Sequence, residues 1–124
     1  MTTYRAAVVG CGWVSGEHIA AYKKHPQTEV AALVSLTVEE ARRKAEEYGL
    51  NVPCYDSVEK MMQQEKPDIV SITSIPTMHV EHGLCAVEYG AQLVMEKPVA
   101  LSREDLHRLT RSVTEHGTKS VVSF

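Results

Sequence analysis

The chain has 124 residues, of which 44% are apolar and 23% charged, and its formal net charge is −3. This size and composition predict one soluble globular domain with a core of its own. The absence of a basic patch argues against a nucleic-acid partner. No apolar run approaches the roughly 20 residues of a membrane span.

Cysteine usage and the start of the chain both favour a cytoplasmic location. Cys11, Cys54 and Cys85 are odd in number and far apart, and no C-x-x-C pair occurs. A disulfide framework or a zinc site is therefore not expected, which fits a reducing compartment. The N-terminal residues lead directly into a predicted strand without a signal-peptide pattern.

A short apolar run at 4–9 ends at two glycines with G-x-G spacing, and a helical pattern over 14–24 follows directly. This arrangement predicts a strand, a tight turn and a helix whose first N–H groups can hold an anion. Gly10 permits the sharp turn, and Gly12 lets a pyrophosphate approach the backbone. Ser15 is small enough for close strand–helix packing. An ordinary β–α turn, in which the glycines serve only the backbone angles, is the alternative.

Two larger residues, Trp13 and Val14, lie inside this turn. Their place between the glycines and the helix puts both next to the predicted phosphate site. Trp13 either packs over the cofactor or covers the strand, and both alternatives stay open.

Strands and helices alternate along the rest of the chain. Such alternation predicts a parallel sheet, because each helix must return the chain before the next strand begins. Six strands with a glycine turn after the first predict a doubly wound α/β domain, a Rossmann fold with strand order 3-2-1-4-5-6. Pro53 suggests an edge position for the third strand. After the first helix, the predicted elements are strand 29–34, a helix from Thr37 to Gly49, strand 51–55, a short helix from Asp56 or Ser57, strand 69–73, a helix from Thr77 to Gly90, strand 92–96, a helix from Ser102 to Gly117 and strand 119–124.

The starts of the helices carry capping signals. Thr37 is followed three residues later by Glu40, which predicts a capping box at the second helix. Thr77 is the predicted N-cap of the fourth helix. In the last helix, Leu106 and Leu109 recur at helical spacing and are predicted to be buried.

The triplet Glu96-Lys97-Pro98 follows the fifth strand directly. In an open parallel sheet, ligands bind at the carboxyl ends of the strands, near the switch point between the first and fourth strands. The charged pair therefore lies where a ligand would bind. The alternative is a loop ion pair between Glu96 and Lys97, followed by a turn proline.

Together these motifs resemble the N-terminal domain of the glucose–fructose oxidoreductase/inositol dehydrogenase/rhizopine-catabolism (Gfo/Idh/MocA) family. The resemblance implies NAD(P)-dependent oxidation or reduction of sugars, polyols and related small hydroxy or keto compounds. It spans Tyr4 to Phe124 and rests on Gly10-Cys11-Gly12, Ser15, His18, Ser74-Ile75-Pro76-Thr77-Met78-His79 and Glu96-Lys97-Pro98.

The resemblance implies a catalytic role for Lys97. In the family, the lysine of this triplet lies by the nicotinamide and hydrogen-bonds the reacting substrate, and Glu96 would position it. An ammonium beside the reacting oxygen stabilises negative charge, and the pKa of a lysine falls when it is desolvated or placed near other cations. The predicted cofactor-binding residues are Gly10, Gly12, Trp13, Val14, Ser15, Ser35, Thr37, Ser74, Pro76, His79, Glu96 and Lys97.

The cofactor is NAD or NADP. NAD-preferring folds place an acidic residue at the end of the second strand, and here that position is Ser35. A serine does not repel a 2′-phosphate, although Leu36 follows where NADP users often carry Arg or Lys. The nearest cations, Arg42 and Arg43, lie about a turn into the helix. We therefore expect a slight preference for NADP.

The resemblance also implies a part that this chain lacks. Family members continue into a second α/β domain with most of the substrate pocket, commonly a catalytic Asp and His, and the sheet used for oligomerisation. Residues 121–124 form an apolar end that resembles a cut. We expect residues 1–124 to be the cofactor domain of a homo-oligomeric enzyme whose C-terminal domain follows. A non-catalytic sensor with the same fold is the alternative, and Lys97 favours the enzyme.

The histidines allow several interpretations. His79 and His82 form an H-x-x-H pair, but no third ligand appears at helical spacing, so no metal site is predicted. His79 either closes the nicotinamide end of the site, as in the family, or serves the start of its helix. His18 resembles a family position, although a solvated or packing histidine is the simpler interpretation.

Overall fold

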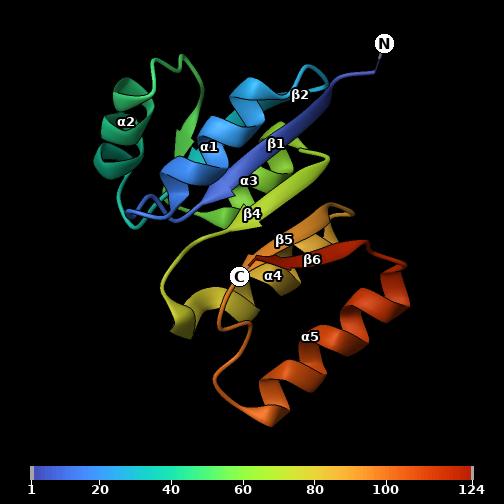
Figure 1. The fold of residues 1–124 in the computed structure, drawn as a ribbon. Coiled ribbons are helices and arrows are strands. Elements are labelled where there is room, and N and C mark those ends of the chain that lie inside the picture. Colours follow the sequence, from blue (N-terminus) through green and yellow to red (C-terminus); the bar gives the residue numbers. More distant parts are fainter. Residues whose placement is uncertain (1, 124) are drawn as a thin grey trace.

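The computed structural model describes residues 2–123 as a six-stranded sheet with helices on both faces (Figure 1). The strand order is β3-β2-β1-β4-β5-β6, and all neighbouring strands run parallel. The predicted Rossmann fold and its strand order are therefore confirmed, with β3 at an edge. The strands are β1 (Tyr4–Val9), β2 (Thr28–Val34), β3 (Cys54–Tyr55), β4 (Ile69–Ile72), β5 (Gln92–Glu96) and β6 (Ser120–Ser123). The helices are α1 (Ser15–Lys24), α2 (Val38–Glu47), α3 (Val58–Glu65), the 3₁₀ helix η1 (Pro76–Met78), α4 (His79–Glu88) and α5 (Arg103–His116).

The core forms two layers because successive strand residues point to opposite faces of the sheet. In β1, Val8 packs with residues of α1 and α2, whereas Ala7 and Val9 pack with residues of α3, α4 and α5. Ser71 of β4 and Glu96 of β5 lie on the α1 side, where both contact His18. Within residues 2–123, no helix combines the length and apolar character needed to cross a membrane. Phe124, predicted to end the sixth strand, lies outside the described residues.

Two helices differ from the predictions. α4 does not begin behind a Thr77 cap, because η1 precedes it and neither helix has a capping side chain. Pro76 is the first residue of η1, where its fixed φ favours a helical turn. Leu106 of α5 is 43% exposed, whereas Leu109 is buried. α5 packs on α4 rather than across the sheet, so the face around Leu109 is covered and Leu106 is not.

Gly10 marks a close approach between the chain after β1 and the chain after β4. Its φ is +92°, and a Cβ at this position would lie 2.7 Å from the carbonyl carbon of Thr73 and closer still to the backbone of Ser74. Thr73 Oγ1 donates to the Gly10 carbonyl oxygen at 2.6 Å. Only glycine fits this turn without moving the end of β4.

Gly90 is a matched control for Gly10, since its φ is +89° but a Cβ there would meet nothing within 4 Å. Gly90→Ala should lower the free energy of unfolding by about 1–2 kcal/mol, the cost of the backbone conformation alone. Gly10→Ala should cost at least about 2 kcal/mol more, because it adds a clash with backbone. Urea unfolding of both variants measures the difference. Equal losses would show that Gly10 and Ser74 are not tightly packed.

Candidate functional site

A cavity of about 650 Å³ lies at the carboxyl ends of β1, β2, β4 and β5. It brings together ten of the twelve predicted cofactor-binding residues, whereas Ser15 and Thr37 do not line it. A smaller hollow of about 460 Å³ lies between α3, α4 and α5. The predicted residues that line the larger cavity are Gly10, Gly12, Trp13, Val14, Ser35, Ser74, Pro76, His79, Glu96 and Lys97.

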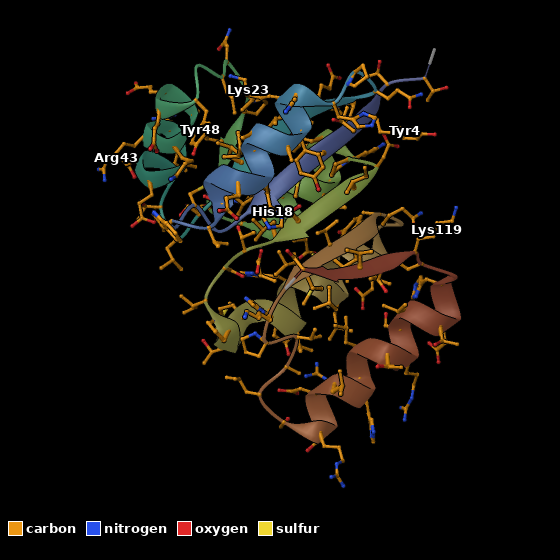
Figure 2. The ribbon with its side chains drawn as sticks, viewed as in Figure 1. Tyr4, His18, Lys23, Arg43, Tyr48 and Lys119 are labelled. Carbon is orange, nitrogen blue, oxygen red and sulfur yellow. The ribbon has the colours of Figure 1, made fainter. Side chains whose placement is uncertain are left out.

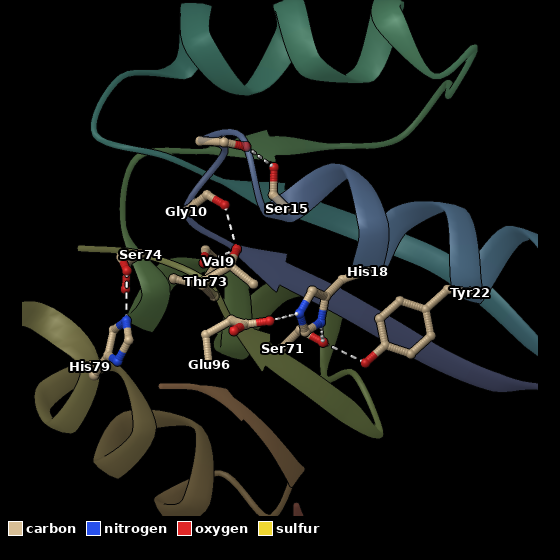
Figure 3. Close-up of polar contacts among 11 residues, drawn as sticks. Val9, Gly10, Ser15, His18, Tyr22, Ser71, Thr73, Ser74, His79 and Glu96 are labelled. Atoms are coloured by element: carbon tan, nitrogen blue, oxygen red, sulfur yellow. Dashed lines mark hydrogen bonds and ion pairs between the residues drawn. The ribbon is translucent and has the colours of Figure 1, made fainter. Parts of the chain in front are cut away.

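The turn between β1 and α1 leaves backbone donors free. The N–H groups of Gly12, Trp13 and Val14 make no hydrogen bond within residues 2–123, and no side chain caps α1. A Cβ at Gly12 would meet nothing within 4 Å, so the space beside it is open. Ser15 is fully buried and donates to the Gly12 carbonyl oxygen at 2.6 Å, which supports the turn from behind (Figure 3). This arrangement suits an anion at a helix N-terminus.

The glycine after this turn has a packing role that the sequence did not reveal. A Cβ at Gly16 would lie 2.9 Å from Tyr48 Cζ and closer still to its hydroxyl oxygen. Tyr48 is the C-cap residue of α2. Gly16 therefore lets α1 approach the end of α2, which is the close packing expected near the third position of the glycine motif.

The end of β2 carries an acidic group that sequence reasoning missed. Ser35 Oγ donates to Glu40 Oε2 at 2.8 Å, and Glu40 and Asp56 both line the cavity. Thr37 caps α2 by accepting the Glu40 N–H at 3.1 Å, as predicted. The prediction that the Glu40 side chain reaches back to the Thr37 N–H is wrong, because this side chain accepts from Ser35 instead. Glu40 stands only five residues after Ser35, so the sequence contains a carboxylate near the end of β2. The capping pattern at Thr37 gives that carboxylate a different predicted role.

His79 ties together the loops that follow β4 and β5. Its ring is 1% exposed and contacts the carbonyl oxygens of Ser74 at 2.6 Å and Pro98 at 2.7 Å. It begins α4, and the two carbonyl contacts go to the loops instead of capping the helix. His82 lies next to it, with Nδ1 2.8 Å from Ser74 Oγ. Burial, together with the nearby His79, lowers the pKa of His82, which favours a neutral ring at pH 7.

Glu96 and Lys97 are neighbours in sequence but do not pair. Glu96 Oε1 lies 2.9 Å from His18 Nε2, and the only salt bridge of Glu96 within residues 2–123 is this one. The loop ion pair considered from the sequence is therefore wrong. His18 is not solvated either, because its side chain is 10% exposed and its Nδ1 lies 3.0 Å from Ser71 Oγ. The hydrogen bond from His18 holds the pKa of Glu96 below its ordinary value.

The remaining candidates are placed as follows. Trp13 is 89% exposed, so it does not cover the strand. Cys11 lines the cavity, but burial raises its pKa to about 11, which keeps the thiol protonated at neutral pH. Among the described residues, no three His, Cys, Asp or Glu side chains gather as a metal site would require.

The fold, the free helix N-terminus and the cavity are those of a dinucleotide-binding domain. Residues 4–124 match the model of an oxidoreductase family with an NAD-binding Rossmann fold, Gfo/Idh/MocA. The chain belongs to this family, as its sequence motifs predicted.

Similar proteins carry this domain as part of a longer chain. The sequence is 32% identical over 121 residues to D-glucoside 3-dehydrogenase of Escherichia coli, covering 97% of this chain and 34% of that protein. It is 26% identical over 120 residues to inositol 2-dehydrogenase of Burkholderia ambifaria, covering 96% and 36%. The chain thus spans about a third of the length of these relatives.

Solved structures share the fold. Scyllo-inositol dehydrogenase from Lactobacillus casei, with bound NAD(H) and scyllo-inositol, has a TM-score of 0.89 at 22% identity, covering 98% of this chain and 36% of that one. The WlbA dehydrogenase from Bordetella pertussis, in complex with NADH and UDP-GlcNAcA, has a TM-score of 0.89 at 25% identity, covering 98% and 37%.

Proposed function

We propose that this chain is the cofactor domain of a dehydrogenase that transfers hydride between a nicotinamide cofactor and a sugar, polyol or related hydroxy or keto compound. One observation carries the proposal: a single cavity joins the glycine turn, the end of β2 and Lys97. The substrate class is that of the named relatives, D-glucoside 3-dehydrogenase and inositol 2-dehydrogenase. We further propose that a C-terminal domain after residue 124 completes the substrate pocket.

The pyrophosphate of the cofactor is proposed to lie against residues 10–15. Gly12 leaves open space beside its backbone, and the three free N–H groups that begin at Gly12 supply donors. The positive end of the α1 dipole adds to their attraction for a phosphate. Trp13, exposed at the same turn, is proposed to pack over the bound cofactor.

Gly12→Val should abolish dinucleotide binding while the chain stays folded. The added side chain occupies the space proposed for the phosphate, yet meets no protein atom near its Cβ. Gly12→Ala, which adds one carbon, should lose less affinity. Calorimetric titration of NAD(H) and NADP(H) measures binding, and circular dichroism checks the fold. An unchanged affinity of folded Gly12→Val for the dinucleotides would contradict the proposed position of the phosphates at this turn.

The cofactor is proposed to be NAD rather than NADP. The slight NADP preference expected from the sequence depended on the lack of a carboxylate at Ser35. The Glu40 carboxylate accepts from Ser35 Oγ at 2.8 Å and lines the cavity, with Asp56 nearby in its wall. A carboxylate here can accept hydrogen bonds from ribose hydroxyls and repels a 2′-phosphate.

Glu40→Gln should narrow the preference for NAD over NADP by roughly tenfold, because it removes the charge that repels the 2′-phosphate. Glu39→Gln is the matched control, since it changes the net charge equally but does not line the cavity. Titrating both cofactors into the wild type and both variants gives the two affinity ratios. A wild type that prefers NADP, or equal ratios in the two variants, would contradict the role of Glu40.

Lys97 is proposed as the catalytic residue of this domain. The nicotinamide, when bound, supplies or accepts the hydride. Lys97 lies exposed in the cavity wall, where its ammonium can donate a hydrogen bond to the reacting oxygen of the substrate. It thereby stabilises the negative charge that develops on that oxygen and helps move its proton.

In the complete protein, Lys97→Met should lower kcat by roughly 10²-fold or more while cofactor affinity stays within about twofold. Lys24→Met, an exposed lysine of α1, is the control. Steady-state kinetics on an accepted polyol or sugar test this. If Lys97→Met kept the kcat of the wild type, Lys97 would not be a catalytic residue. Cofactor binding without turnover by the complete wild-type protein would favour a sensor.

A further inference from the structure

Glu96 and Lys97 are adjacent at the end of β5, but the Glu96 carboxylate contacts α1 whereas Lys97 lines the cavity. Glu96 turns toward α1, where its carboxylate meets His18. Lys97 is exposed and makes no salt bridge within residues 2–123. Because successive side chains of a strand point to opposite faces of the sheet, the end of β5 already favours separate positions for the two charges, and the contact with His18 fixes Glu96 on the α1 side.

A chain of hydrogen bonds leads from α1 across β4 to Glu96 (Figure 3). Tyr22 Oη lies 2.6 Å from Ser71 Oγ, which lies 3.0 Å from His18 Nδ1. Burial raises the pKa of Tyr22, so its hydroxyl keeps a proton to donate to Ser71. Ser71 can then donate to His18 Nδ1, which leaves the proton of a neutral imidazole on Nε2, facing Glu96. A doubly protonated ring also carries a proton on Nε2. In both states Nε2–H can donate to the Glu96 carboxylate, which only accepts.

The His18 ring is the hydrogen-bond partner of the Glu96 carboxylate on this side of the sheet. The pKa of Glu96 is lowered first by the hydrogen bond from His18, and further by the Ser123 side chain and the Lys97 backbone N–H. The His18 and Glu96 side chains are only 10% and 15% exposed. Figure 2 shows His18 beside the sheet, whereas Arg43 and Lys119 lie at the outer edge of the molecule. His18 is thus placed to bind Glu96, not solvent.

We infer that His18 is a positioning residue of the site: it holds the Glu96 carboxylate on the α1 side and thereby leaves the Lys97 ammonium unpaired toward the cavity. Without the Nε2–H donor, Glu96 would turn to the adjacent ammonium. The importance of a free Lys97 rests on the proposed function. Where the ammonium lies can be measured independently of catalysis.

The test is trace acetylation of the chain with acetic anhydride at pH 8, with the rate at Lys97 measured by mass spectrometry. Lys24, exposed on α1, is the internal reference. In His18→Leu, the relative rate at Lys97 should fall about threefold, the effect of one exposed lysine–carboxylate pair. His18→Gln, which keeps an N–H donor, should retain most of the wild-type rate. The double variant His18→Leu/Glu96→Gln should recover it fully.

Three results would overturn the inference. The first is an unchanged rate in His18→Leu. The second is an equal fall in the double variant, which would point to a collapsed loop instead of capture by Glu96. The third is faster acetylation in Glu96→Gln alone, which would show that Glu96 already pairs with Lys97 in the wild type. The last comparison needs no change at His18, so it decides even where His18→Leu fails to fold. If Lys97→Met failed to lower kcat, the proposed catalytic role of Lys97 would be wrong. The acetylation experiment would still show whether His18 keeps Glu96 away from Lys97.

Discussion

The site depends on one close contact between two backbone segments, at Gly10 and Ser74. No side chain fits at position 10, so the chains leaving β1 and β4 meet at the switch point of the sheet. The Ser74 carbonyl then contacts His79, whose other ring nitrogen reaches the Pro98 carbonyl. These contacts together fix the turn after β1 relative to the loop that carries Lys97. A parallel sheet makes this possible, because all its strands end on the same edge.

The charged and polar groups around the cavity match the groups of the proposed cofactor along its length. Glu40 and Asp56 give the β2 end an acidic character, the free N–H groups near Gly12 attract anions, and Lys97 provides a cation near β5. Each group comes from a different β–α junction, so no single junction recognises the cofactor alone. We propose that this domain forms one part of the site and that the proposed C-terminal domain positions the substrate.

Local signals predicted the fold well, and tertiary contacts account for what they missed. Apolar periodicity and glycine turns placed all six strands and their order. The Thr37 half of the predicted capping box is confirmed, but the Glu40 side chain does not complete the box because nearby Ser35 donates to its carboxylate. His18 and Glu96 are 78 residues apart, so no spacing rule joins them until the sheet is built. Leu106 repeats correctly on its helix but stays 43% exposed within residues 2–123, because α5 packs on α4 through the face around Leu109.

The most direct test of the account is to map NAD⁺ binding on the ¹⁵N-labelled chain by NMR titration. If NAD⁺ binds in the cavity, the largest amide shifts occur at residues 10–14, 35–40, 73–79 and 96–97, which line or border it. Residues around the smaller hollow between α3, α4 and α5, including Tyr89 and Arg108, should hardly change. Shifts centred on that hollow, or a binding surface that excludes Gly12 and its neighbours, would contradict the account.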